Sequence, residues 1–564
     1  MMTRHIYTIL ILMAFTYTSC QKLEDWPMEL ITEEYLWDEK DSLGTNASYF
    51  LNTIYGEMPT GFNRIGGNLL CAATDDAVPS ADNATVSRIT NGGYSPINNP
   101  DDSWSANYAS IRKCNLFLQN FPRITLKQDL RQEGVYWMAE ARFLRALFYF
   151  ELVKRYGGVP LLGDRVLTLD DDLRLPRNSY EECINYIVNE CDVAKENLRP
   201  DPVPNGDFGR ITKMAALTLK AKALLYAASP LNNPSNDKNK WRLAKDALAE
   251  AIQYGSSSGF SLESSFSNVF LTRKNNEIIL AYQRAVTTDL ELNNGPIGYV
   301  SGNTASRGRT SPTQELVDAF PTIKGLPITD DIKSPINPTG YDPNNPYANR
   351  DPRLSLTVFY NGMPWLNRPV ETFDGGLDRP GGAVVQTKTG YYMRKFLGNF
   401  SSGTAYSNQT HNFPIFRYAD VLLMFVEAKN EVDGPVDSVY TYLREIRRRA
   451  GIQQGSAPNL YGIPDGLSQD AMRELIRNER RIEMAFEEQR YWDLRRWKIA
   501  EQIFNKPLHG VRISKVGSNF TYNIETLAIP FQFIAPRMYR YPIPFSEISK
   551  NPNLTQNEDY LTVH

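Results

Sequence analysis

The stretch QEGVYWMAEARFLRALFYFELVKRY, residues 132–156, decides the fold class. Apolar side chains occupy most of the circumference of the helix that it predicts, which is typical of a helix buried between neighbours. Gly157 and Gly158 end this helix, and Pro160 prevents it from resuming. We therefore expect other helices to pack around it.

Helical spacing of apolar residues recurs in two blocks. It predicts helices over 105–121, 179–198, 212–228 and 241–254 in the first block, and over 418–432, 436–450 and 468–504 in the second. Helix–turn–helix pairs recur every roughly 35–45 residues, which indicates stacked helical hairpins such as tetratricopeptide repeats. The repeat consensus is only weakly present, so the prediction concerns architecture. The fold class is mainly α.

Two loop-rich segments, residues 43–100 and 255–413, interrupt the helical pattern. In the second segment, 355–360 followed by Asn361-Gly362 predicts a β-hairpin, and 390–397 predicts a Tyr-rich strand. Loops on a rigid scaffold commonly carry binding residues. We therefore expect a helical scaffold at 102–254 and 416–504, and a ligand-binding region with little β-structure in the two loop-rich segments.

Composition and charge narrow the class of protein. The chain has 564 residues, with 61 Lys and Arg against 64 Asp and Glu, and a formal net charge of −3. This balance excludes a basic nucleic-acid-binding surface over the chain as a whole and argues against a disordered polyelectrolyte. Aromatic residues make up 12%, including 31 Tyr, a residue suited to half-buried and binding surfaces.

The first residues predict an export signal. Arg4 and His5 precede an apolar run over 6–15, and small or polar residues lead to Cys20. This arrangement resembles a lipobox, which implies removal of residues 1–19 and lipidation of Cys20. Tyr17 departs from the Leu usual at that position, and the alternative is an ordinary signal peptide with Cys20 incidental. No later segment has eighteen uninterrupted apolar residues, so the mature chain is not expected to span a membrane.

The remaining cysteines, Cys71, Cys114, Cys183 and Cys191, predict neither a metal site nor a close disulfide. Cys183 and Cys191 lie on one predicted helix, separated by a rise of roughly 12 Å, which is too far for a disulfide. No Cys-x-x-Cys pair is present, so a zinc site is not expected. We expect four small buried side chains, no metal and no cofactor.

The patterns that resemble catalytic motifs favour structural roles. The segment 468–504 is rich in charge, and Arg480, Glu483, Glu487 and Arg490 follow helical spacing, so we expect them to pair along one helix face. Arginine beside each acid keeps it ionised, whereas a glycosidase acid needs a raised pKa. Residues 255–259 match the hydrolase serine pattern but follow a helix instead of a strand. No residue is predicted to be catalytic.

Several motifs in order then resemble the SusD/RagB family. They are Ala139-Glu-Ala-Arg-Phe-Leu-Arg-Ala146, Tyr156-Gly-Gly-Val-Pro160, Arg350-Asp-Pro-Arg353, Phe416-Arg-Tyr-Ala-Asp420, Asn478-Glu-Arg-Arg-Ile-Glu483, Phe486-Glu-Glu-Gln-Arg490, Asp493-Leu-Arg-Arg-Trp497 and Tyr541-Pro-Ile-Pro544. The resemblance covers nearly the whole mature chain. It implies one SusD-like domain over 20–564, with tetratricopeptide-like hairpins that support a loop-rich binding region.

The resemblance also implies a function. Members of this family are surface lipoproteins of the Bacteroidetes that capture glycans, or in some cases peptides, and sit on a SusC-like, TonB-dependent outer-membrane transporter. We therefore expect an outer-membrane, lipid-anchored protein that faces the cell exterior, binds an oligosaccharide and lacks catalytic activity. Peptide capture is the first alternative. A glycoside hydrolase and a scaffold without a ligand are the others.

The expected ligand contacts are aromatic and amide side chains in the loop-rich regions. A glycan site requires exposed aromatic faces flanked by polar groups. Trp104 follows the loop Asn98-Asn-Pro-Asp-Asp102, with Asn107 three residues later; Tyr299 lies in a Gly-rich segment, and Trp365 follows the Asn361-Gly362 turn. Members of the family commonly place ligand contacts near the first two of these segments. The alternative is that these aromatic residues are ordinary, partly buried side chains.

Overall fold

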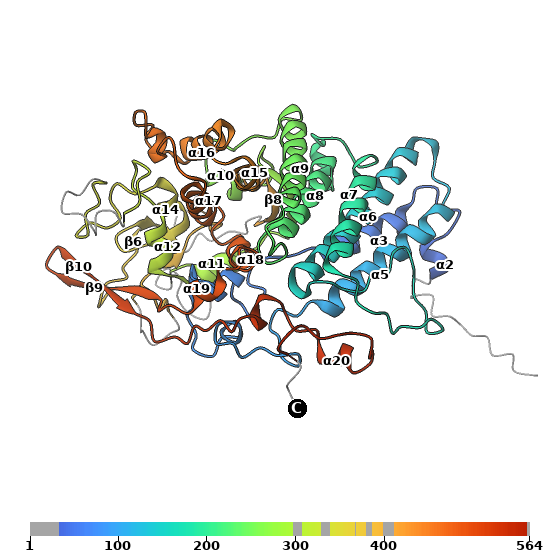
Figure 1. The fold of residues 1–564 in the computed structure, drawn as a ribbon, viewed down its shortest axis with the longest axis horizontal. Coiled ribbons are helices and arrows are strands. Elements are labelled where there is room, and N and C mark those ends of the chain that lie inside the picture. Colours follow the sequence, from blue (N-terminus) through green and yellow to red (C-terminus); the bar gives the residue numbers. More distant parts are fainter. Residues whose placement is uncertain are drawn as a thin grey trace, which may run out of the picture.

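A computed structural model describes residues 33–296, 307–328, 339–366, 368–379, 386–398 and 411–560 (Figure 1). At its centre lies α6 (Arg131–Tyr156), the helix predicted from residues 132–156. Most of its side chains are buried, and both glycines that follow it are buried as well. Within the described ranges, no helix is both long enough and apolar enough to cross a bilayer.

Consecutive helices pack side by side, as in stacked hairpins. The successive contacts run from α5 to α6, α7, α8 and α9, and α9 then contacts α15, which joins the two helical blocks. The bounds are α3 (Thr45–Tyr55), α5 (Trp104–Asn120), α7 (Tyr180–Lys195), α8 (Lys213–Ala228), α9 (Lys238–Ser257), α15 (Tyr418–Asp433) and α16 (Asp437–Ala450). Apart from α3, these bounds agree with the predicted ranges within a few residues. The sequence predicts no helix at α3, which lies inside the segment 43–100 that we expected to be loop-rich. A capping box formed by Ser179 and Glu182 begins α7.

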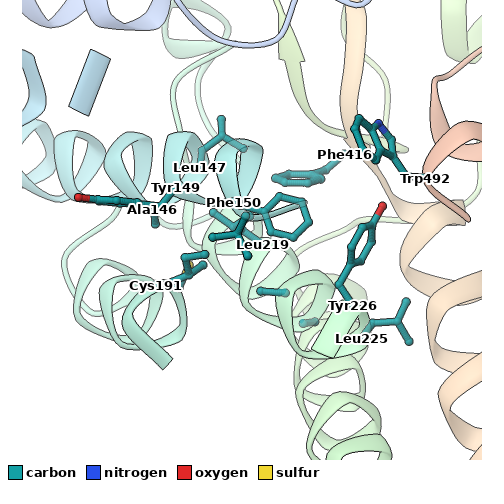
Figure 2. Packing of buried hydrophobic residues seen from close by; sticks show 14 of the residues in the cluster. Ala146, Leu147, Tyr149, Phe150, Cys191, Leu219, Leu225, Tyr226, Phe416 and Trp492 are labelled. Carbon is teal, nitrogen blue, oxygen red and sulfur yellow. The ribbon is translucent and has the colours of Figure 1, made fainter. Parts of the chain in front are cut away.

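One apolar core runs through the helical scaffold. Figure 2 shows Leu147 and Phe150 of α6 beside Leu219 and Tyr226 of α8, with Trp492 from the C-terminal part of the chain close by. The rings of Phe150 and Tyr226 meet edge to face at 5.2 Å between centroids. Aromatic and aliphatic side chains from both blocks therefore stabilise a single scaffold.

A second core lies under the loop-rich region, which Figure 1 places at the opposite end from α2 and α3. Five two-stranded antiparallel sheets, counted over the described residues, tie this region together. They pair β1 (Ala77–Pro79) with β3 (Thr310–Pro312), β2 (Ile278–Tyr282) with β8 (Phe413–Arg417), β4 (Val358–Phe359) with β7 (Tyr392–Met393), β5 (Pro364–Trp365) with β6 (Arg368–Pro369), and β9 (His509–Val516) with β10 (Asn519–Thr526). Several of these pairs join segments far apart in sequence.

Short helices complete the loop-rich parts and the ends of the described chain. They are α2 (Glu33–Leu36), α4 (Ser87–Thr90), α10 (Asn268–Leu271), α11 (Asp289–Asn294), α12 (Gln314–Ala319), α14 (Pro352–Thr357) and α20 (Phe545–Ile548).

The hairpin predicted at 355–360 is wrong. Residues up to Thr357 form α14, and β4 pairs with β7 instead of with a strand after Asn361-Gly362. The Asp351 side chain accepts a hydrogen bond from the backbone N–H of Arg353, and Pro352 occupies the first turn. Both features favour a helix start, and they outweigh the turn signal that follows. Of the strand expected at 390–397, only the two residues of β7 are extended in a sheet.

The single helix predicted over 468–504 is also wrong. The chain forms α17 (Gln469–Glu483), α18 (Gln489–Arg496) and α19 (Ala500–Phe504). Phe486 and Glu488 have positive φ of 65° and 62°, which breaks the helix. The ammonium group of Lys395 donates to the carbonyl oxygens of Glu483 (3.0 Å) and Ala485 (2.9 Å). A distant lysine thus satisfies carbonyls that a continuous helix would have used.

Candidate ligand-binding site

The structure buries Trp104 and Asn107, two of the residues that we expected to contact the ligand. The Trp104 side chain lies against Tyr108 and Tyr156, with ring centroids 5.2 and 5.1 Å away, and only 4% of the residue is exposed. Asn107 is 8% exposed, and its Nδ2 donates to the Ser103 carbonyl at 2.8 Å. The expectation of an exposed indole is therefore wrong for Trp104, because the α5–α6 interface needs that ring for its own packing.

Trp365 contributes no exposed face either. Trp365 is 5% exposed and lies 4.8 Å from the Phe359 ring, inside the core of the loop-rich region. Tyr299 and Cys20 lie outside the residues that the structure describes. As ligand contacts, Trp104, Asn107, Trp365 and Tyr299 stay predictions.

The loop before Trp104 nevertheless borders a groove of about 350 Å³. We call it the loop groove. One wall is the loop 96–102, and the other is the segment 542–546, near α20 in Figure 1. The lining residues are Pro96, Ile97, Asn98, Asn99, Asp102, Pro542, Pro544, Phe545 and Ser546. The backbone N–H of Phe545 donates to the Pro96 carbonyl at 2.9 Å, which joins the two walls.

Asp101 holds the two walls in register. Its carboxylate accepts a hydrogen bond from the Tyr541 hydroxyl at 2.8 Å and pairs with Arg64 and Arg155. Burial acts to raise the pKa of Asp101, but the two guanidiniums outweigh burial and hold that pKa well below its ordinary value. The carboxylate stays ionised, so it keeps the loop 96–102 attached to Tyr541, the residue before the segment 542–546.

The walls of the groove combine apolar and amide groups. Phe545 is 56% exposed and Ile97 is 73% exposed, so an aromatic ring and an aliphatic side chain both face solvent. The Asn98 side chain accepts from Arg88 at 2.6 Å, which leaves its own amide N–H groups available. The buried Nδ2 of Asn99 has no hydrogen-bond partner. An exposed ring beside amide donors suits a ligand with C–H faces and hydroxyl groups.

Sequence reasoning missed Phe545. The motif Tyr541-Pro-Ile-Pro544 was noticed for its resemblance, yet the residue after it forms a groove wall. The local signal was an aromatic residue directly after two prolines, in a segment without helical or alternating apolar periodicity.

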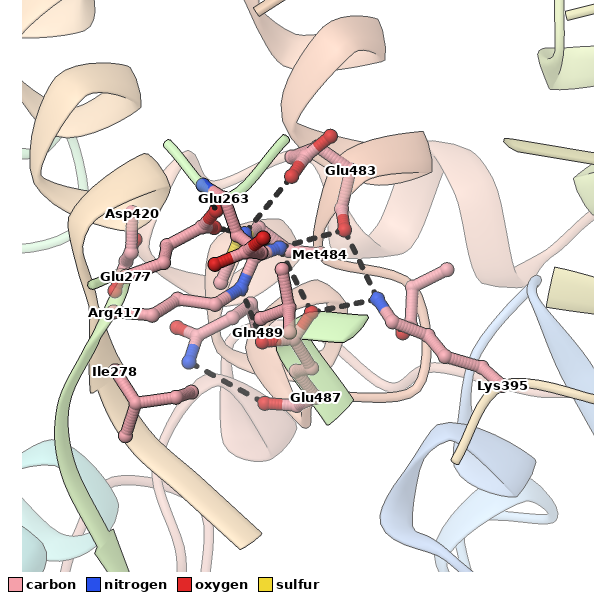
Figure 3. Close-up of polar contacts among 12 residues, drawn as sticks. Glu263, Glu277, Ile278, Lys395, Arg417, Asp420, Glu483, Met484, Glu487 and Gln489 are labelled. Atoms are coloured by element: carbon pink, nitrogen blue, oxygen red, sulfur yellow. Dashed lines mark hydrogen bonds and ion pairs between the residues drawn. The ribbon is translucent and has the colours of Figure 1, made fainter. Parts of the chain in front are cut away.

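Glu483 and Glu487 of the predicted helix 468–504 belong to a buried ionic network, shown in Figure 3. The Arg417 guanidinium lies 2.6 Å from Glu277, 2.8 Å from Glu483 and 2.7 Å from Glu487. Lys395 pairs with Glu487 at 2.6 Å. These five side chains are at most 1% exposed, so the network has no access to a substrate.

The pairing that we expected along one helix face is wrong in detail. Arg480 pairs with Asp420 (2.5 Å) and Asp493 (2.7 Å), and Arg490 pairs with Asp75 (2.8 Å). The break after Glu483 rotates the later residues away from that face, so the partners come from distant segments.

The pKa values in the network oppose acid catalysis. Burial acts to raise the pKa of Glu483, but the arginines around it lower that pKa far below its ordinary value. Burial lowers the pKa of Lys395 to about 8, against the opposing effect of Glu487. A general acid at neutral pH needs a raised carboxyl pKa, and Glu483 has the reverse.

The burial predicted for the four cysteines is confirmed. All four cysteines within the described residues are buried and free of disulfides. Burial is the largest cause of a raised pKa at Cys183, to about 11. In the same part of the chain, no group of three or more His, Cys, Asp or Glu side chains is arranged to hold a metal ion.

Comparison with known proteins identifies the family. A family model described as the SusD family matches residues 276–560, about half of the chain, and a second, described as "Starch-binding associating with outer membrane", matches 66–225. The chain belongs to the SusD family.

Individual relatives span almost the whole chain. SusD-like protein P2 of Formosa agariphila is 25% identical over 99% of both chains. Starch-binding protein SusD of Bacteroides thetaiotaomicron is 22% identical over 89% of this chain and 87% of its own length. The crystal structure of a SusD-like protein from Bacteroides fragilis superposes with a TM-score of 0.77 at 28% identity, covering 94% of this chain and 99% of that one.

A more distant structure shares the fold. A laminarin-binding SusD-like protein has a TM-score of 0.65 at 21% identity, covering 92% of this chain and 99% of that one. The mainly helical architecture with small sheets is therefore the SusD-like fold, as the sequence predicted. The division of helices into tetratricopeptide repeats stays a prediction.

Proposed function

We propose that this protein binds oligosaccharides at the loop groove and takes part in glycan uptake at the outer membrane. Membership of the SusD family carries the proposal. Two relatives are named for the glycans that they bind, starch in one case and laminarin in the other. Binding without catalysis is the corresponding role, since the arginines around Glu483 hold its pKa far below the raised value that a general acid needs.

The chemistry of the loop groove supports a sugar ligand. A pyranose ring presents an apolar C–H face that packs on an exposed aromatic ring such as Phe545, while its hydroxyl groups accept hydrogen bonds from the exposed Asn98 side chain. Covering a few tens of Å² at ~25 cal/mol per Å² contributes about 1–2 kcal/mol for each aromatic ring. With one exposed aromatic ring, the affinity should be micromolar or weaker.

Localisation and partner belong to the same proposal. The description of the second family model includes association with the outer membrane. Lipidation at Cys20 anchors the protein there, facing the cell exterior, and a SusC-like, TonB-dependent transporter receives the bound glycan. The family resemblance and the N-terminal sequence support these steps.

Calorimetry with a panel of oligosaccharides, including fragments of starch and laminarin, tests the proposal. Phe545→Ala should weaken binding of the preferred glycan about tenfold, because the exposed ring is lost. Tyr49→Ala is the matched control: Tyr49 is an aromatic residue on α3 that is 66% exposed and outside the groove, and its removal should leave affinity unchanged. Equal affinity of wild type and Phe545→Ala would show that the ligand does not bind at the loop groove.

The same panel decides between the alternative functions. Binding of peptides with no binding of any glycan would favour peptide capture. Release of shortened sugars during prolonged incubation would identify a hydrolase.

A further inference from the structure

The helical scaffold contains a second, larger cleft of about 610 Å³. We call it the scaffold cleft. Its walls are the loop 230–236 after α8, side chains of α15 and α17, and Trp497 with Lys498 after α18. It shares no lining residue with the loop groove. Its volume lies in the usual range for small-molecule sites.

Most charges around this cleft neutralise one another. Arg473 makes a bidentate pair with Glu431 at 2.5 and 2.8 Å. Glu427 accepts from Arg496 at 2.5 Å and from the Trp497 indole N–H at 2.7 Å. Because these strong donors and acceptors are already satisfied, they offer little net charge to a ligand.

Two polar atoms in the lining are buried without a partner. Asn430 on α15 is 0% exposed, and its Oδ1 accepts no hydrogen bond. Its Nδ2 donates to the Gln469 carbonyl at 3.0 Å, which fixes the orientation of the amide. On α17, the Nε of Arg477 is also buried and donates to nothing, although Nη1 donates to Glu474 at 2.7 Å. An unsatisfied buried polar group costs about 1–3 kcal/mol, so each calls for a partner.

The two unsatisfied atoms need different kinds of hydrogen-bond partner. Asn430 needs a donor, and Arg477 needs an acceptor. A hydroxyl group is both, whereas a carboxylate supplies only acceptors and an ammonium group only donors. The Arg477 guanidinium also lies 5.1 Å from the centre of the Trp497 ring, which holds its Nε in place.

We infer that the scaffold cleft is a second binding site, separate from the loop groove, for a neutral polyhydroxylated ligand. The inference rests on the proposed function for the identity of the ligand as a glycan. Its location depends only on the unsatisfied atoms of Asn430 and Arg477. Two sites on one protein would raise the avidity for a long polysaccharide without any new contact.

Fluorine NMR of protein labelled with 5-fluorotryptophan tests this site. Trp241 and Trp497 line the scaffold cleft, and Trp→Phe variants assign their signals. Titration with maltotriose and laminaritriose, as fragments of starch and laminarin, should shift one or both signals. Asn430→Leu should weaken the response about tenfold or more. Asn239→Leu is the matched control, since Asn239 is exposed and outside the lining.

A second variant tests the scaffold cleft even if Asn430→Leu does not fold. Asp470 lies on the rim with 87% of its side chain exposed, so Asp470→Tyr should fill the entrance without disturbing the core. This variant should abolish the shifts of the Trp241 and Trp497 signals and leave the thermal stability unchanged.

Calorimetry of Phe545→Ala separates this inference from the proposed function. Suppose that Phe545→Ala loses binding and that the Trp241 and Trp497 signals of wild type do not shift. This result would contradict binding at the scaffold cleft and support binding at the loop groove. If the Trp241 and Trp497 signals shift and Phe545→Ala binds with normal affinity, the result would support binding at the scaffold cleft and contradict binding at the loop groove. Absence of any response to either saccharide, in both measurements, would refute both sites.

Discussion

Replacing Glu487 by Gln should destabilise the fold strongly without touching ligand binding. The carboxylate is 1% exposed and accepts from Lys395 at 2.6 Å and from Arg417 at 2.7 and 2.9 Å. The amide keeps the shape but removes the charge, and it turns N–H groups toward other donors. Breaking a buried pair in this way costs about 3–5 kcal/mol, because the remaining cations are left uncompensated.

Urea denaturation measures this cost as a change in the free energy of unfolding. Glu525→Gln is the matched control. Glu525 is 54% exposed and 4.0 Å from Arg512, and such surface pairs contribute about 0–1 kcal/mol. Affinity of folded Glu487→Gln for a glycan should equal that of wild type. A loss of less than about 1 kcal/mol would refute the structural role, and a stable variant without binding would move the site to this network.

Three further predictions concern other parts of the chain. The pKa of Lys395 is about 8 in the folded protein and about 10.4 in an unfolded chain, so the folded protein loses this proton at lower pH. The free energy of unfolding of wild type should therefore rise relative to that of Lys395→Met as the pH increases from 8 to 10. Urea titrations in which this difference stays constant or falls would contradict the prediction. Trp104→Ala removes a ring buried between two tyrosines and should cost about 3–5 kcal/mol, so the melting temperature should drop; an unchanged melting temperature would show that the ring is not part of the core. Cys20→Ala should be lost from the outer-membrane fraction, since stable anchoring needs the acyl chains; continued fractionation with that membrane, together with labelling by a palmitate analogue, would disprove lipidation at Cys20.

Local signals predicted the helices because they determine helix ends directly. The glycines after Tyr156 and the capping box at Ser179 act within one turn of the chain. At 468–504 the helical spacing continues while the helix does not. The break depends on Lys395, which reaches the carbonyl of Glu483 from 88 positions earlier in the chain. The residues near 483 in the sequence do not indicate this contact, so the break could not be predicted from them.

The candidate site was predictable only in part, for the same reason. The loop before Trp104 was expected to carry the ligand, and it does border a groove. The opposite wall comes from Phe545, which lies more than four hundred residues later and is joined to Pro96 by a backbone hydrogen bond. Whether an aromatic residue is exposed depends on what packs over it. That is why Trp104 proved to be buried while Phe545 faces solvent.

A crystal structure of the protein with its preferred trisaccharide bound is the most direct test of the central claim. The account predicts a sugar ring stacked on Phe545, with hydroxyl groups within hydrogen-bond distance of the Asn98 side chain. A saccharide bound elsewhere, with the loop groove empty at saturating concentration, would contradict it.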